Sequence, residues 1–104
     1  MNISHAEVKA ERDATGSQLR IEGAFDARTI DEIAPALDAV VAERPHRVTV
    51  DLDKVPLLDS AGVSAIVSLW RRIKAQGGTV AIVHAHDQPA VVLKLLKVES
   101  VLAA

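Results

Sequence analysis

The chain has 104 residues, a formal net charge of −2 at pH 7 and 49% hydrophobic residues, which is enough for one domain with its own core. Aromatic residues make up only 2% and the basic residues form no stripe, which argues against a nucleic-acid partner. No apolar run approaches the ~20 residues that span a bilayer, the first residues lack a signal-peptide pattern and there is no cysteine, so we expect a cytoplasmic protein without a membrane partner or disulfides.

The first two strands are expected to form a hairpin. Residues 4–11 have the pattern of a modest strand, and residues 17–23 alternate so that Leu19 and Ile21 face inward. The DATG segment between them is rich in residues that accept turn conformations. The two segments therefore predict an antiparallel pair.

A helix is expected over residues 29–43, because apolar residues recur there at helical spacing. Thr29 and Glu32 fit a capping box at its start. Pro35 leaves two possibilities open: the helix is kinked at the proline, or its regular part begins near Ala34 with the proline in the first turn.

A strand, a helix and another strand follow, which predicts a parallel crossover connection. The strand over 46–52 alternates, whereas the strand over 78–85 is nearly continuously apolar, as expected of a central strand covered on both faces. The helix between them runs over 60–76 and ends at a glycine pair. At about 100° per residue, one arc of this helix is apolar and packs. The opposite arc is expected to be free and consists of Ser60, Ser64, Ser68, Arg71 and Arg72.

The last part of the chain predicts an amphipathic helix over residues 87–97, and residues 98–104 are a candidate for a short edge strand. Strands and helices thus alternate after an initial hairpin. This order predicts a single α/β domain over residues 1–104, with a mixed sheet of four or five strands packed against helices.

Asp59 and Ser60 follow an apolar run and open the predicted helix over 60–76. At a helix N-terminus, backbone N–H groups lack partners and the macrodipole favours negative charge. One interpretation is structural, since Asp and Ser are preferred N-caps that usually do nothing else. The other is a phosphorylation switch, in which a phosphate on Ser60 is held by the same N–H groups. Position alone leaves both interpretations open.

Three motifs spread over most of the chain together resemble the STAS domain of anti-sigma factor antagonists. They are a turn with Gly23, Phe25 and Asp26, a helix-opening segment with Leu58, Asp59, Ser60, Gly62 and Val63, and the pair Gly77-Gly78 before a strand. Two positions depart from the family pattern. Ala24 stands where the family usually has Glu, and Ala61 stands where it usually has a second hydroxyl residue.

The resemblance implies a STAS fold and a non-enzymatic partner-switching protein. Ser60 would be the phosphoacceptor of an anti-sigma factor that is also a serine kinase of the histidine-kinase-like ATPase type, and a serine phosphatase would reverse the modification. Ala61 leaves the phosphoacceptor unambiguous, and Ala24 removes a carboxylate, so an atypical partner is expected. The expected partner-binding residues, at this end of the central helix and on its free face, are Asp26, Asp59, Ser60, Gly62, Ser64 and Arg71.

Alternatives remain open for several of these residues. Asp26 is equally explained as a turn residue, and Arg71 as the solvated end of a helix. The alternative function is a STAS scaffold subunit of a transporter-associated or signalling complex, in which Ser60 only caps its helix.

Enzymatic and metal chemistry are not expected. No base stands at a recognisable spacing from Ser60, there is no Gly-x-Ser-x-Gly elbow, and the glycine pair lacks the signature of a nucleotide-phosphate loop. His84 and His86 share one face of an extended chain, but further ligands of known spacing are missing. We therefore expect neither a metal nor a cofactor.

Overall fold

Four strands form one mixed sheet in the order β1-β2-β3-β4 in the computed structural model, which describes residues 5–103. β1 and β2 are antiparallel, whereas β2, β3 and β4 are parallel to one another. The predicted mixed sheet is therefore confirmed, and it has four strands. The strands are β1 (Glu7–Asp13), β2 (Gly16–Glu22), β3 (Arg47–Lys54) and β4 (Thr79–Val83).

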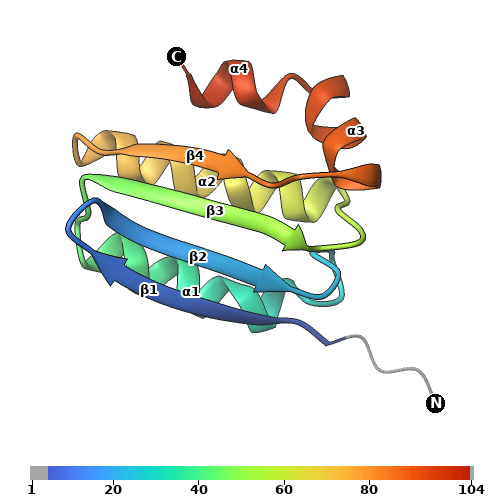
Figure 1. Cartoon of the computed structure of the whole chain (residues 1–104), viewed down its shortest axis with the longest axis horizontal. Coiled ribbons are helices and arrows are strands. Elements are labelled where there is room, and N and C mark those ends of the chain that lie inside the picture. The colour runs from blue at the N-terminus through green and yellow to red at the C-terminus, as the bar shows by residue number, and fades with distance from the viewer. Residues whose placement is uncertain (1–4, 104) are drawn as a thin grey trace.

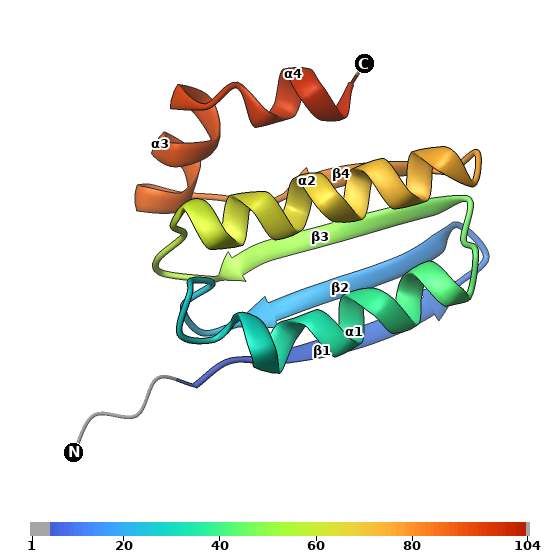
Figure 2. The same ribbon diagram turned by 180° about the vertical axis from the view of Figure 1, so that it is seen from behind.

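Two long helices cover one face of this sheet. Figure 2 shows α1 (Ile30–Ala42) lying across β1 and β2, and α2 (Ser60–Ala75) lying beside it over β3 and β4. The short helices α3 (Asp87–Leu95) and α4 (Val98–Leu102) follow β4 and lie beyond it (Figure 1). Each strand-to-strand crossover thus carries a helix back across the same face.

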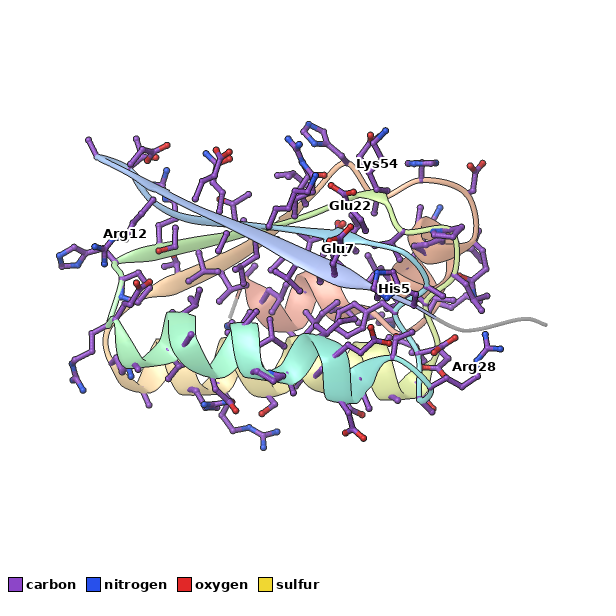
Figure 3. All side chains as sticks on the ribbon, turned by 90° about the horizontal axis from the view of Figure 1, so that it is seen from below. His5, Glu7, Arg12, Glu22, Arg28 and Lys54 are labelled. Carbon is purple, nitrogen blue, oxygen red and sulfur yellow. The ribbon has the colours of Figure 1, made fainter. Side chains whose placement is uncertain are left out.

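The core lies between the sheet and the two long helices, because alternate strand residues and one stripe of each helix are apolar. The other face of the sheet is polar, and Figure 3 shows Glu22 and Lys54 projecting from it, away from the helices. Ion pairs such as Lys9 to Glu22, at 3.3 Å, cross this face. The residues that fill the core include Leu19, Ile21, Val48, Val50, Leu52, Ile33, Leu37, Ile66, Leu69 and Ile73.

The prediction of a central strand over 78–85 is wrong, because β4 is an edge strand. Its apolar run has a different cause. Val80 is buried and Ile82 half-buried beneath α2, and α4 also packs against β4. A continuous apolar pattern reports coverage of a strand but not the element that covers it.

The prediction of an edge strand over 98–104 is also wrong, since residues 98–102 form α4. Val98 is buried and Leu102 half-buried against the core, and a spacing of four places both on one face of a helix. Residue 104 and residues 1–4, which include the start of the predicted first strand, lie outside the described residues.

The start of α1 differs from the predicted capping box. Thr29 precedes the helix but makes no side-chain cap; its hydroxyl instead donates to Ala24 O at 2.7 Å. Glu32 Oε2 accepts from Ala6 N at 3.4 Å, so neither side chain caps the other's backbone. The helix begins at Ile30 with Pro35 inside it, which rules out a start near Ala34.

Candidate functional site

Three loops meet where the parallel strands end. Residues 23–29 follow β2, residues 55–59 follow β3 and residues 84–86 follow β4, and Figure 1 shows these loops on the same side of the molecule. Phe25 and Leu58 form an isolated parallel bridge between the first two loops. The carboxyl ends of parallel strands are the usual place for functional groups in such sheets.

The first turn of α2 is capped by Asp59. This residue has an extended backbone, and its Oδ1 accepts from Gly62 N at 3.0 Å. Its Oδ2 accepts from Ala27 N in the neighbouring loop at 3.1 Å. One carboxylate therefore both closes the helix end and joins it to the loop that follows β2.

Ser60 is the first residue of α2 and is exposed. Among residues 5–103 its hydroxyl has no hydrogen-bond partner, and the interpretation that Ser60 caps the helix is wrong because Asp59 occupies that position. The N–H groups of Ser60 and Ala61 also find no acceptor within the described chain, because no helical turn precedes them. Asp59 accepts from the next two N–H groups, that of Gly62 with Oδ1 and that of Val63 with its carbonyl oxygen. An exposed hydroxyl thus lies beside unpaired N–H groups at the positive end of a helix.

Gly62 is buried because the backbone of the loop after β2 passes directly over it. A Cβ at this position would lie 2.4 Å from Phe25 O and 2.6 Å from Leu58 Cδ1. Glycine is therefore required for the close approach of α2 to the two loops, and Gly62 shapes the site from below its surface.

Asp26 lies in the loop next to Ser60, as expected, but its side chain is directed into its own turn. Its Oδ1 accepts from Arg28 N at 2.9 Å and from Thr29 N at 3.2 Å, and the residue is 3% exposed. The hydrogen bond from the Arg28 guanidinium, 2.9 Å from Oδ2, lowers the pKa of Asp26 below 3.8, against the effect of burial. This geometry favours the turn role that the sequence left open.

The free face of α2 is confirmed, since Ser60, Ser64, Ser68, Arg71 and Arg72 are all exposed. Arg72 Nη1 reaches Asp38 of α1 at 2.9 Å. At 1.5 Å rise per residue, Arg71 lies about 16 Å along the helix from Ser60. A partner that contacts both residues must therefore cover three turns of α2.

The sequence model of the STAS domain matches residues 6–103. The chain belongs to the STAS domain family. The family resemblance and the α/β fold expected from it are thus confirmed. No curated protein matches this STAS domain.

Solved structures of anti-sigma factor antagonists are similar to this STAS domain. One from Mycobacterium paratuberculosis has a TM-score of 0.82 and 20% identity, covering 93% of this chain and 82% of that chain. Unphosphorylated SpoIIAA has a TM-score of 0.73 and 14% identity, covering 89% and 83%. The phosphorylated form of the Bacillus cell fate determinant SpoIIAA has a TM-score of 0.64 and 14% identity, covering 89% and 86%. At these identities the likeness shows the fold.

The two histidines after β4 contact different groups. His84 Nδ1 lies 3.3 Å from Asp51 Oδ2, whereas His86 Nε2 lies 2.8 Å from Asp53 O. Within residues 5–103, no three His, Asp or Glu side chains are arranged to hold a metal ion. In the same part of this STAS domain, no helix has the length and apolar character needed to cross a bilayer.

Two contacts at the site could not be found by sequence reasoning. Asp59 reaches Ala27, and the Gln88 side chain reaches Leu58. These partners are 32 and 30 residues apart. No local spacing or periodicity signals such a pair, and Gln88 stands in the sequence as an ordinary polar residue near a helix start.

Proposed function

We propose that this STAS domain is a cytoplasmic, non-enzymatic anti-sigma factor antagonist that works by partner switching. Unphosphorylated, it binds an anti-sigma factor that is also a serine kinase of the histidine-kinase-like ATPase type. Phosphorylation of Ser60 releases that partner, and a serine phosphatase restores binding.

The observation that carries the proposal is that Asp59 caps α2 while the neighbouring Ser60 does not. Asp59 makes the cap, so the hydroxyl of Ser60 is exposed and has no partner among residues 5–103. A kinase can modify such a hydroxyl without breaking a structural contact. The solved phosphorylated and unphosphorylated forms of SpoIIAA, which share this fold, support a switch of this kind.

Charge explains how phosphorylation would release a partner. A phosphate adds about −1.5 to −2 charge at neutral pH. In the free domain this charge is tolerated, because the helix N-terminus stabilises an anion by ~0.3–1 kcal/mol and water screens Asp59. In a complex the water is excluded, and a phosphate beside a carboxylate without a matching cation costs several kcal/mol. Repulsion therefore dominates only when the partner is bound.

The proposed contact surface is the exposed stripe of α2 that begins at Ser60 and includes Ser64 and Arg71. Asp59 is half-buried, and Asp26 and Gly62 are buried. In this proposal those three residues act chiefly by fixing where the first turn of α2 lies. Ser60 is then both the phosphorylated residue and part of the surface that contacts the partner.

Phosphorylation assays test the proposed acceptor. Each histidine-kinase-like ATPase of the source organism is incubated with the domain and ATP, and the product is analysed by mass spectrometry. We expect one of them to add a single phosphate at Ser60, none to the Ser60→Ala protein, and the normal amount to the matched Ser64→Ala control. Phosphate on the Ser60→Ala protein, or none on the wild type with any kinase, would refute the switch; in the second case the scaffold function takes its place.

Calorimetric titration with the same kinase tests the release step. Ser60→Asp, an imperfect phosphate mimic, should weaken binding by at least ~1.4 kcal/mol, a factor of ten. Ser60→Ala should bind nearly as well as wild type. Equal affinities for the two variants would contradict release by charge.

A further inference from the structure

The backbone just before Ser60 is held from two sides. Phe25 N donates to Leu57 O at 2.8 Å, and Asp59 N donates to Phe25 O at 3.3 Å. In an extended chain, the N–H and C=O groups of successive residues point in opposite directions. Leu58 lies between Leu57 and Asp59, so its own N–H and C=O groups face away from Phe25 and need another partner.

Gln88, in the first turn of α3, supplies that partner. Its Oε1 accepts from Leu58 N at 2.8 Å, and its Nε2 donates to Leu58 O at 2.9 Å. A single side-chain amide thus takes the place of a neighbouring strand. Leu58 is fully buried beneath the exposed Gln88, so both of its backbone groups depend on this side chain for their hydrogen bonds.

The segment that carries Gln88 is itself anchored beside the same loop. His86 Nε2 lies 2.8 Å from the carbonyl oxygen of Asp53, near the end of β3. Asp87, between these anchored residues, has a φ of 53°, a left-handed conformation that Asp adopts more readily than most other non-glycine residues. The backbone thus changes direction immediately before Gln88, at the start of α3.

We propose that Gln88 is a positioning residue for the phosphoacceptor. It fixes the backbone of Leu58, and through it the placement of Asp59 and Ser60 in front of the kinase. This inference rests on the proposed role of Ser60, but the position that Gln88 imposes on the loop is testable without a kinase.

Amide hydrogen exchange measured by NMR tests the positioning itself. In Gln88→Met, which preserves length but removes both hydrogen bonds, the Leu58 amide should exchange at least about ten times faster. Amides in the middle of β2 and β3 should keep their wild-type rates. The matched control Gln18→Met changes an exposed glutamine of β2 and should leave Leu58 unaffected. An unchanged Leu58 rate in Gln88→Met would overturn the proposal.

A second variant separates this effect from a general loss of packing. Gln88→Glu keeps an acceptor for Leu58 N but, when ionised, has no donor for Leu58 O. Acidification protonates the introduced carboxyl group and restores the donor. The protection factor of the Leu58 amide should therefore rise towards the wild-type value as the pH is lowered, whereas a pH-independent protection factor would contradict the pairing.

The consequence for Ser60 is measured with the kinase that phosphorylates the wild type. For Gln88→Met, kcat/KM should fall at least about fivefold because a misplaced acceptor reacts poorly, while Gln18→Met should match the wild type. Equal kcat/KM values for Gln88→Met and wild type would overturn the role in presentation. If no kinase modifies the wild type, the proposed function fails, and the exchange experiment still decides whether Gln88 positions the loop.

Discussion

Replacing Asp59 by alanine removes the carboxylate that joins the start of α2 to the loop after β2. Loss of an N-cap costs ~0.5–2 kcal/mol, and here the cap bond is the one from Gly62 N at 3.0 Å. Loss of the second bond, from Ala27 N at 3.1 Å, adds about 0.5–1.5 kcal/mol. We therefore expect Asp59→Ala to lower the free energy of unfolding by ~1–3.5 kcal/mol.

Ser60→Ala is the matched comparison, because it alters the next residue without breaking a hydrogen bond. Its free energy of unfolding should stay within about 0.5 kcal/mol of the wild type, like that of other exposed substitutions. Urea unfolding followed by circular dichroism measures both, and the melting temperature of Asp59→Ala should fall by at least about 4 °C. If Ser60→Ala costs as much as Asp59→Ala, the assignment of the cap to Asp59 is incorrect.

Three further predictions follow from the same loops. Gly62→Ala should lose ~1–3 kcal/mol of stability in urea unfolding despite the better helix propensity of alanine, because its Cβ would lie 2.4 Å from Phe25 O; a stabilised variant would contradict this. Because the pKa of Asp26 is lowered on folding, its ionised carboxylate stabilises the fold at pH values above the unfolded pKa near 3.8. The stability advantage of wild type over Asp26→Asn should therefore shrink as the pH falls through the folded-state pKa, and a pH-independent difference would contradict this. Hydrogen bonds to the carbonyl of Asp53 and, second, to the Asp87 side chain raise the pKa of His86 above 6.5. Protonated His86 therefore stabilises the fold fully below pH 6.5, and this stabilisation is lost as the pH rises through the folded-state pKa. NMR titration of the imidazole measures that pKa, and a value at or below 6.5 would exclude the effect.

Much of the architecture could be predicted because it depends on local periodicity. Val48, Val50 and Leu52 alternate along one strand, and all three are buried in β3. The polar and apolar arcs of residues 60–76 correctly separated the exposed face of α2 from its packed face. Such patterns are direct consequences of the repeat of side-chain direction in strands and helices, so they survive without knowledge of the tertiary structure.

The candidate site was only partly predictable, because several of its contacts join residues that are far apart in the sequence. The sequence brought attention to Asp59 and Ser60 as a polar pair at a helix start, but either residue could have been the cap. The choice depends on where the loop after β2 passes, since Ala27 N holds the second oxygen of Asp59. Asp26 likewise stood in the right loop, but only its burial against Thr29 and Arg28 directs its carboxylate inward.

Sequence by itself determined the order of strands and helices as far as α3, the STAS motifs and the position of Ser60 at the start of a helix. The tertiary structure decided that β4 is an edge strand, that residues 98–102 form a helix and that Thr29 and Glu32 serve other contacts. It also decided that Gln88 pairs with Leu58. In each of these cases a backbone or side-chain group finds its partner or its cover in another element. Local sequence spacing carries no information about such contacts between elements, because these contacts are set by how the whole chain packs.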